Sequence, residues 1–445
     1  PYQSFSAIAG NTHLIDFDLL TQMGLLKEAD YASVNFGDDP TSVDYERIFY
    51  ARRPILETAV KNFLANQSFQ ADFKHFEKNN RLWLDDFAEF MAIKEHFGNQ
   101  ALQKWDDKRA VARDPSALEK YRSMLAEQIQ YFKVTQYFFF KQWGELKDYA
   151  NQRGIKIIGD MPIYVAADSV EVWTKPELFQ LDKERNPLFV AGVPADQFSA
   201  TGQLWGNPLY DWEEHKKQGY TWWIHRIEES FKIYDVLRID HFKGFSDYWQ
   251  VDGKAEVAKD GSWQPGPGYD LFKAVKEQLG DLPIIAEDLG NIDDKARKLL
   301  ADCNYPGMKI LQFGFEDVSG KSLDSPHYCI PHSIVYTGTH DNDVTNGWYN
   351  GLTDQQQQYI NDYTHRSEDE SICQAMIRQL FATVSNTAIA TMQDVLDLPA
   401  SSRMNVPSTI GGNWQWRMQQ SDLTQDKKDF LAKMTTLYQR ANQEK

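Results

Sequence analysis

Four acidic residues in the chain are placed where carboxylate chemistry could occur, and the segment around Asp240 shows why. Val236–Ile239 predicts a short buried strand, and Asp240 comes directly after it. Because side chains alternate along a strand, Arg238 and Asp240 face the same side. An adjacent guanidinium favours an ionised carboxylate, and an ionised, oriented Asp at a strand end can act as a nucleophile. On this segment alone, a structural Arg–Asp pair is the simpler interpretation.

The other three acidic residues also come at or after the ends of predicted strands, namely Asp160 after Ile155–Ile158, Glu287 after Pro283–Ala286 and Asp341 after Ser333–Tyr336. A single acid in such a place is often the cap of the next helix. Helices and strands alternate through this part of the chain, however, which predicts a parallel α/β fold. In a (β/α)8 barrel the carboxyl ends of the strands converge on one face, so the four acids would gather there.

Two carboxylates that face each other across a glycosidic bond can cleave it. One must be ionised to attack the anomeric carbon, and the other must hold a proton at neutral pH for the leaving oxygen, which requires a raised pKa. Asp240 beside Arg238 suits the first role. Glu287 follows the apolar residues Ile284, Ile285 and Ala286 and suits the second.

The residue pattern leaves two choices open. Glu287 and Asp288 are neighbours, so alternation sends them to opposite sides and only one can face the barrel axis. Asp341 and Asp343 lie two positions apart in a loop, and either could face inward. His340 could donate a hydrogen bond to a sugar hydroxyl or be satisfied by backbone groups.

Composition argues against several classes of function. The chain has 445 residues and a formal net charge of −17, which argues against a nucleic-acid-binding surface. Aromatic residues make up 13% of it, including 13 Trp; some must be core, but exposed aromatic rings also stack on sugars. The three cysteines form no disulfide framework and fit a reducing cytoplasm. No apolar run approaches the roughly 20 residues that span a bilayer, and no signal peptide is visible.

The expected organisation is one catalytic (β/α)8 barrel over 1–445 that carries insertions. Residues 21–113 predict a mostly helical insertion, because they are rich in charge and Phe and lack strong strands. Residues 162–220 predict a loop-rich insertion over the active-site cleft. A long helix is expected from Pro115 to Ala150. We expect no cofactor and no metal, since the chain lacks a glycine-rich phosphate loop and a Cys/His cluster with metal spacing.

Longer segments resemble one family. LRIDHFKG, IIAEDLG and GTHDND resemble the catalytic segments of the α-amylase clan. GDMPIYVAADSVEVW, VAGVPADQFSATGQLWGNPLYDW and PYQSFSAIAGN are more specific and resemble the 4-α-glucanotransferases (amylomaltases) of glycoside hydrolase family 77. The resemblance runs from residue 1 to about Trp416. It implies a (β/α)8 barrel that transfers α-1,4-glucan segments to the 4-hydroxyl of glucose or another maltodextrin, with retention of configuration.

The resemblance implies a role for each candidate residue. Asp240 matches the nucleophile, Glu287 the general acid/base and Asp341 the third acid, which helps to distort and hold the sugar ring. Substrate contacts are implied for Arg238, His340, Asp160, Tyr2, Trp205 and Asn405. Without the resemblance, Trp205 would be interpreted as a buried anchor of its loop. The family also carries two barrel strands upstream of PYQSFSA, so we expect an N-terminal segment before Pro1, because a barrel without them would have open edges.

The expected reaction has two displacements at Asp240, through a covalent glucosyl-enzyme. Expected partners are α-1,4-glucans (maltodextrins, starch or glycogen fragments) and glucose, with no nucleic acid and no membrane; the oligomeric state is open. The alternatives are an α-1,4-glucan hydrolase of the same clan, a non-catalytic glucan-binding barrel, and a metal hydrolase that chelation would inactivate.

Overall fold

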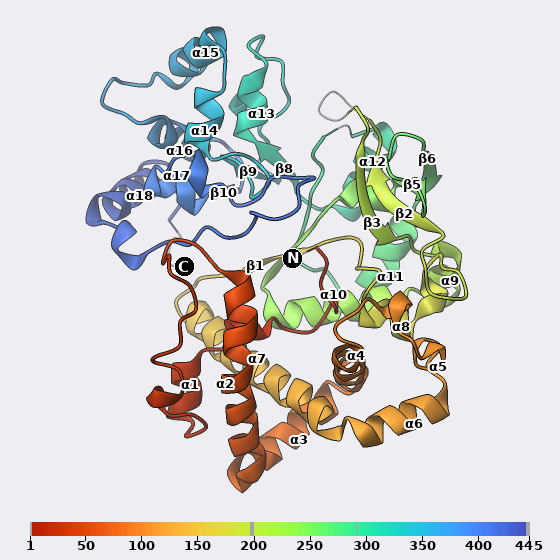
Figure 1. Cartoon of the computed structure of the whole chain (residues 1–445). Coiled ribbons are helices and arrows are strands. Elements are labelled where there is room, and N and C mark those ends of the chain that lie inside the picture. The colour runs from red at the N-terminus through yellow and green to blue at the C-terminus, as the bar shows by residue number, and fades with distance from the viewer. Residues whose placement is uncertain (1, 196–199, 291, 442–445) are drawn as a thin grey trace. The chain divides into compact units, whose positions relative to one another are not determined.

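The computed structural model describes residues 2–195, 200–290 and 292–441 and divides into two compact units (Figure 1). The first unit comprises Pro1–Phe36, Glu46–Ile284 and Ile292–Cys303. The second unit comprises Gly37–Tyr45, Ile285–Asn291 and Asn304–Lys445. Each unit contains a parallel sheet with predicted site residues at or near the ends of its strands.

The parallel sheet of the first unit carries Asp240. Strand β1 (Ile158–Met161) runs parallel to β4 (Val236–Ile239), and Asp160 pairs with Arg238 across the two strands. Strand β4 has the bounds that the sequence predicts, and Leu237 and Ile239 are both 0% exposed. The Leu237 N–H donates to the Pro283 carbonyl, where the chain enters β7 (Ile284–Ala286). Asp240 therefore follows a strand that is fixed by burial on one face and by pairing on both edges.

Strand β1 begins later than the sequence predicts, and the prediction that Asp160 follows the strand is wrong. Asp160 lies inside β1. The carboxylate of Asp235 accepts the Ile157 N–H at 2.8 Å, and the Asn151 side chain donates to the Ile155 carbonyl at 3.0 Å. Side chains therefore satisfy backbone groups that the prediction assigned to a strand.

The parallel sheet of the second unit has the order β10-β9-β8, with β8 (Gly307–Ile310), β9 (Ser333–Tyr336) and β10 (Thr387–Ile389). Strand β9 has its predicted bounds. Helices surround this sheet (Figure 1), namely α13 (Leu311–Glu316), α14 (Thr345–Asn350), α15 (Asp354–Thr364), α16 (Ile372–Ala382), α17 (Met392–Leu396) and α18 (Gln425–Leu437). The core between them includes Phe315, Val335, Ile360 and Met376.

The predicted insertion at 21–113 is helical in the part of the chain that the structure describes. Its helices are α2 (Tyr45–Ala65), α3 (Gln70–Asn79), α4 (Leu84–His96) and α5 (Lys108–Val111). The long predicted helix that follows is two helices, α6 (Pro115–Met124) and α7 (Ala126–Asn151). Leu125 separates them, because its φ of −112° and ψ of 24° leave the helical region. Phe63 packs against Phe138 of α7 with ring centroids 5.3 Å apart, so aromatic residues form part of this core.

The remaining helices of the first unit are short or flank the strands. They are α1 (Phe17–Gln22), α8 (Val170–Thr174), α9 (Trp212–Lys217), α10 (Thr221–Ile233), α11 (Tyr269–Leu279) and α12 (Asp294–Cys303).

A second sheet of the first unit lies partly in the segment predicted to be loop-rich. It is antiparallel, with the order β3-β2-β5-β6, and its strands are β2 (Phe189–Val193), β3 (Gln203–Pro208), β5 (Asp247–Asp252) and β6 (Ser262–Pro265). The sequence pattern did not predict this sheet, because glycine in a sequence usually argues against a strand. Strand β2 nevertheless needs a glycine at position 192, since a Cβ there would lie 2.5 Å from the Gln203 carbonyl oxygen. Residues 196–199 of the predicted insertion lie outside the described residues.

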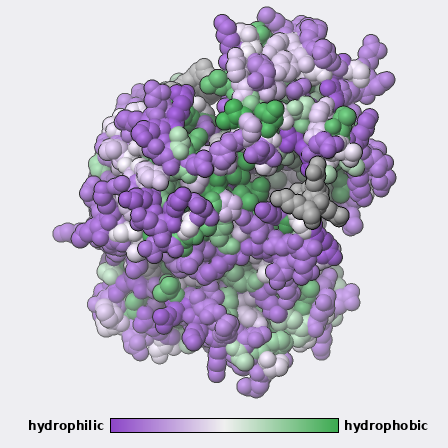
Figure 2. Space-filling view, turned by 180° about the vertical axis from the view of Figure 1, so that it is seen from behind, coloured by the Kyte–Doolittle hydropathy of each residue, from purple (hydrophilic) through white to green (hydrophobic). Residues whose placement is uncertain are grey.

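Hydrophilic residues cover most of the face shown in Figure 2, in keeping with the high content of charged residues. None of the helices that the structure describes is long and apolar enough to cross a membrane.

Candidate active site

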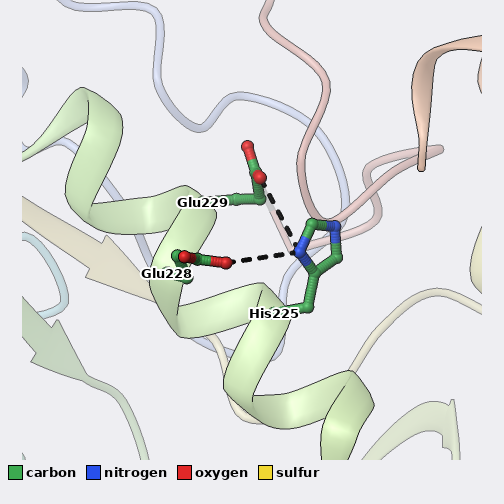
Figure 3. A group of neighbouring side chains, drawn as sticks. All are labelled: His225, Glu228 and Glu229. Carbon is green, nitrogen blue, oxygen red and sulfur yellow. Dashed lines mark ion pairs between the residues drawn. The ribbon is translucent and has the colours of Figure 1, made fainter. Parts of the chain in front are cut away.

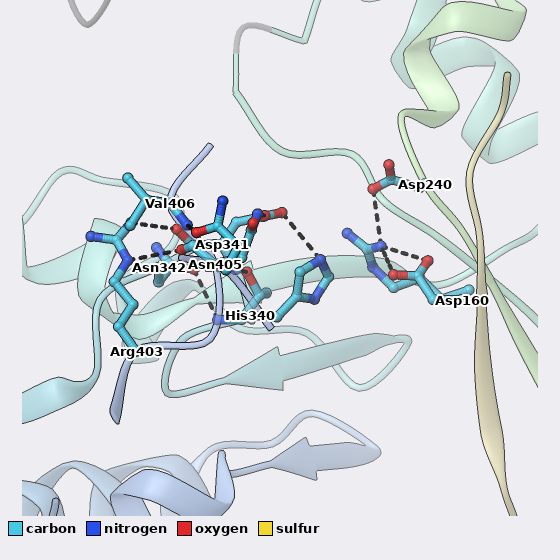
Figure 4. Close-up of polar contacts among 11 residues, drawn as sticks. Asp160, Asp240, His340, Asp341, Asn342, Arg403, Asn405 and Val406 are labelled. Carbon is cyan, nitrogen blue, oxygen red and sulfur yellow. Dashed lines mark hydrogen bonds and ion pairs between the residues drawn. The ribbon is translucent and has the colours of Figure 1, made fainter. Parts of the chain in front are cut away.

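We name Asp160, Arg238 and Asp240 of the first unit the nucleophile group, after the role predicted for Asp240; Figure 4 labels the two aspartates. The Arg238 guanidinium donates from Nη1 to both carboxylate oxygens of Asp160, at 2.7 and 2.6 Å, and the same nitrogen lies 2.9 Å from Asp240 Oδ1. The Arg238 side chain is only 9% exposed, whereas those of Asp160 and Asp240 are 37% and 25% exposed. One enclosed cation therefore stabilises the negative charge of two accessible carboxylates.

The backbone fixes the direction of the Asp240 side chain. The Asp240 N–H donates to the Met161 carbonyl at 3.0 Å, which extends the pairing of β4 with β1. His241 then adopts a left-handed conformation with φ of 50°, so the backbone turns away from the strand direction directly after Asp240. Asp240 is thus the last residue held by the sheet.

His241 connects this strand end to Trp205 on β3. The two rings meet edge to face, with centroids 4.8 Å apart and planes at 87°. Desolvation lowers the pKa of His241 to about 4, so the imidazole is neutral at neutral pH. The Trp205 indole also donates to Gln203 Oε1 at 3.2 Å. The structure thus brings Trp205 next to the residue that follows Asp240.

Glu287 and Asp288, which the sequence could not separate, have different surroundings. Asp288 Oδ1 accepts the Met308 N–H at 2.7 Å, and a Cβ on Gly307 would lie 2.4 Å from Asp288 Oδ2. Burial raises the pKa of Asp288. Asp288 therefore holds the beginning of β8. Glu287, half-buried, accepts the Leu289 N–H at 2.9 Å and is the acid of this pair that is not committed to the strand.

We name His340, Asp341, Arg403 and Asn405 of the second unit the third-acid group, after the role predicted for Asp341 (Figure 4). Asn405, which is 7% exposed, donates from Nδ2 to Asp341 Oδ1 at 2.7 Å. His340 Nε2 lies 3.3 Å from Asp341 Oδ2. Arg403 donates to the backbone carbonyl of Asp341 at 2.8 Å. Each carboxylate oxygen of Asp341 and its peptide carbonyl are thus met by a different side chain.

Asp343, the other acid of this loop, faces helix α14. Its Oδ1 accepts the Val344 N–H at 2.8 Å, and a Cβ on Gly347 would lie 2.6 Å from its carboxylate. Asn342 Oδ1 accepts both the N–H and the hydroxyl of Thr339 at 2.9 Å, which closes the loop on itself. These contacts separate the structural acid Asp343 from Asp341.

Tyr2 lies in the segment that begins the described chain and is half-buried. The first unit anchors this segment at two points: the Val170 N–H donates to the Phe5 carbonyl at 2.9 Å, and Glu171 Oε1 accepts the Ala7 N–H at 2.8 Å. The segment that carries Tyr2 is therefore fixed to the chain that follows β1.

Three residues at these groups were missed by the sequence analysis: His241, Arg403 and Trp414. His241 adjoins the nucleophile candidate and could have been weighed with it. Arg403 stands two positions before Asn405, but the alternation that linked Arg238 to Asp240 applies only to strands, and this segment is a loop. The Trp414 ring lies 5.2 Å from that of His340 (centroid to centroid), across a sequence distance that no local pattern reveals.

One group among the described residues has donors close enough to hold a metal ion, namely His225, Glu228 and Glu229 on α10 (Figure 3). His225 Nδ1 lies 3.8 Å from Glu228 Oε2 and 3.7 Å from Glu229 Oε1. Lys232 also pairs with Glu229 Oε1. Because the Lys232 ammonium already pairs with the Glu229 carboxylate, we interpret the group as a cluster of ion pairs on the helix.

Comparison with known proteins gives the context for these groups. A family model described as 4-alpha-glucanotransferase matches residues 1–424. The chain belongs to the 4-alpha-glucanotransferase family. The 4-alpha-glucanotransferase of Streptococcus pneumoniae is 53% identical over 444 residues, which cover 100% of this chain and 88% of the relative. That of Thermus thermophilus is 40% identical, with 95% of this chain and 85% of the relative covered.

Solved structures agree with the family assignment. The amylomaltase from Streptococcus agalactiae, in complex with acarbose, is 59% identical and matches with a TM-score of 0.98 over 99% of this chain and 89% of that chain. The predicted family, the (β/α)8 barrel class and the enzymatic activity are thereby confirmed. The protein is a glycosyltransferase that acts on α-glucans, and neither the hydrolase nor the non-catalytic alternative is favoured.

Proposed function

We propose that Asp240 is the nucleophile, Glu287 the general acid/base and Asp341 the third acid of the glucan transfer. The observation that supports this assignment best is the shared Arg238 guanidinium, 2.9 Å from Asp240 Oδ1. A nucleophilic carboxylate must be ionised in the free enzyme, and an enclosed cation at that distance stabilises its charge. Asp288 and Asp343, the neighbouring acids that compete for the other two roles, hold the beginnings of β8 and α14 instead.

In the first step, Glu287 protonates the glycosidic oxygen while a carboxylate oxygen of Asp240 attacks the anomeric carbon. The bond between that carbon and the leaving oxygen breaks, and the reducing-end piece departs with the proton. The product is a covalent glucosyl ester on Asp240.

In the second step, Glu287 removes the proton of an incoming 4-hydroxyl, and that oxygen displaces Asp240 from the anomeric carbon. Two inversions give net retention. Glucose or another maltodextrin is the proposed acceptor. Transfer wins over hydrolysis when bound sugar excludes water, and Trp205 and Tyr2 are the aromatic residues proposed to bind it.

The supporting residues follow from the same scheme. We propose that Arg238 and Asp160 contact the donor sugar and hold Asp240, that His340 contacts the donor sugar, and that Asn405 holds Asp341. Residues 21–113 and 162–220 are proposed as insertions on the catalytic face. The location of the protein in the cytoplasm remains a prediction.

Incubation with maltotriose tests the proposed reaction. A transferase releases glucose and makes longer maltodextrins while the total number of reducing ends stays nearly constant. A steady rise in reducing ends would contradict the proposal and indicate hydrolysis. Acarbose, with which the Streptococcus agalactiae amylomaltase was solved, is a proposed ligand, and its effect can be measured in the same assay.

A further inference from the structure

A single loop of the second unit supplies three side chains that contact His340 or Asp341. We name residues 403–414 the clamp loop. Its first residue, Arg403, contacts the Asp341 carbonyl, its third, Asn405, contacts the Asp341 carboxylate, and its last, Trp414, contacts the His340 ring. The loop thus reaches two consecutive site residues from both of its ends.

Arg403 joins the backbone of the clamp loop to that of the site. Its Nη2 donates to the Asp341 carbonyl at 2.8 Å and its Nε donates to the Asn405 carbonyl at 2.9 Å. A guanidinium can span two carbonyls in fixed directions, because its donors are rigid and planar, whereas a lysine ammonium offers one rotating point charge. Arg403 contacts peptide carbonyls rather than side chains, so it fixes where the Asp341 backbone lies.

Two hydrogen bonds within the clamp loop join its two ends. The Trp414 N–H donates to the Met404 carbonyl at 2.7 Å, and Asn413 Oδ1 accepts the Val406 N–H at 2.9 Å. Trp414 itself has a φ of 61°, a strained value for a bulky residue that these hydrogen bonds maintain. The tip, in contrast, is exposed, with Ile410 106% exposed. Hydrogen bonds within the loop therefore hold the part that meets His340 and Asp341.

We propose that Arg403 and Trp414 are positioning residues, which hold Asp341 and His340 in their reactive geometry through the clamp loop. The inference rests on the proposed role of Asp341. Arg403 acts on the reaction through Asp341, and Trp414 acts through His340. Displacement of a reacting group by about 1 Å can cost on the order of 100-fold in rate, so a backbone anchor is enough to control the chemistry.

The test is a double-mutant cycle between Arg403→Met and Asp341→Asn, measured as glucose release from maltotriose. In the wild-type background, we expect Arg403→Met to lower kcat by about 10- to 100-fold and to change KM by less than about threefold. In the Asp341→Asn background, the same substitution is expected to cost less than about threefold, since the residue it positions no longer acts. Arg403→Lys is expected to recover only part of the loss.

Trp414 is tested by a matched pair of substitutions. Trp414→Phe keeps an aromatic ring against His340 and should retain more activity than Trp414→Leu, which fills similar space without a ring. Ile410→Ala is the control within the same loop, and it should leave kcat and the thermal unfolding temperature unchanged. Thermal unfolding separates positioning from misfolding, and Arg403→Lys keeps the cycle measurable if Arg403→Met does not fold.

Two results would overturn the inference. An equal loss from Arg403→Met in both backgrounds would mean that Arg403 acts independently of Asp341, and the clamp role would fail while the proposed function stood. Full activity of Asp341→Asn alone would reject the role of Asp341 and, with it, the clamp.

Discussion

The nucleophile group and the third-acid group each hold an aspartate, but they do so with different chemistry. Asp240 follows a buried strand and pairs with a guanidinium that it shares with Asp160. Asp341 lies in a loop and is held by the neutral amide of Asn405, with Arg403 bonded only to its peptide carbonyl. A guanidinium thus meets the carboxylate in the first group, whereas an amide and the His340 imidazole meet it in the second.

The difference matches the two proposed roles. A nucleophile must be ionised before substrate arrives, so a fixed cation beside it is useful. An acid that distorts and holds a sugar ring needs its carboxylate oxygens in fixed positions, and a cation beside it would compete with the positive charge that develops on the sugar. The comparison therefore predicts unequal responses when charge is removed from one group or added to the other.

The largest expected effect is the loss of the nucleophile itself. Asp240→Asn keeps the size of the side chain but removes the attacking oxygen charge, so we expect kcat to fall by about 10⁴-fold or more. Glu287→Gln should be comparably inactive on maltotriose. Asp252→Asn is the control, because Asp252 is an exposed aspartate on strand β5 of the same unit. Retention of wild-type kcat by Asp240→Asn would end the assignment.

Removal of the shared cation should be next in size. Arg238→Met leaves Asp160 and Asp240 without the cation that both contact and that fixes their direction, so we expect kcat to fall by about 100- to 1,000-fold. Adding Asp160→Asn removes one of the two negative charges and should recover about tenfold of the loss. If the double variant is worse than Arg238→Met by the full cost of Asp160→Asn alone, the guanidinium does not couple the two acids.

The third-acid group, in which a neutral amide meets the carboxylate, should lose activity when a charge is added beside Asp341. Asn405→Ala loses one hydrogen bond and is expected to lower kcat by about tenfold. Asn405→Asp places a second carboxylate beside Asp341 and should cost about 100-fold at neutral pH, with part of the activity returning as pH falls and one acid is protonated. A pH–rate profile of the two variants measures this. Equal losses with parallel profiles would show that charge beside Asp341 is unimportant.

The smallest effect concerns His241, which adjoins the nucleophile. Its folded pKa of about 4 lies below the ordinary value of 6.5, so the fold disfavours its protonated form. Its contribution to stability is complete above pH 6.5 and is lost as pH falls from 6.5 toward 4. His241→Asn should therefore flatten the decline of the urea unfolding midpoint over this range. Exposed His75 on α3 gives the control variant, His75→Asn. If His241→Asn leaves the pH dependence of the urea unfolding midpoint unchanged, the lowered pKa of His241 is contradicted.

The sequence predicted the strands that carry the site where burial and alternation agree. Strand β4 and the position of Asp240 after it were predicted correctly, because Leu237 and Ile239 are apolar and fully buried and the polar residues Arg238 and Asp240 alternate with them. The carboxylate Asp240 was thus identifiable before any family resemblance.

What the sequence could not provide depends on contacts between distant segments. The pairing of Arg238 with Asp160 requires the register of two strands whose paired residues lie 78 positions apart in the sequence, and the pattern places Asp160 after the strand rather than inside it. The choice of Glu287 over Asp288 depends on the Met308 N–H, and the clamp loop depends on a return of the chain to Asp341 from Arg403. No pattern of neighbouring residues in the sequence indicates any of these contacts.

The most direct test of the central claim is to trap the covalent intermediate on Asp240. The Glu287→Gln variant is incubated with an α-maltotriosyl fluoride that lacks the terminal 4-hydroxyl, since fluoride leaves without an acid and the donor cannot serve as its own acceptor. Peptide mass spectrometry should find the added sugar on the peptide that contains Asp240, and Asp240→Asn should abolish the adduct. An adduct on another residue, or one that survives Asp240→Asn, would contradict the assignment of the nucleophile.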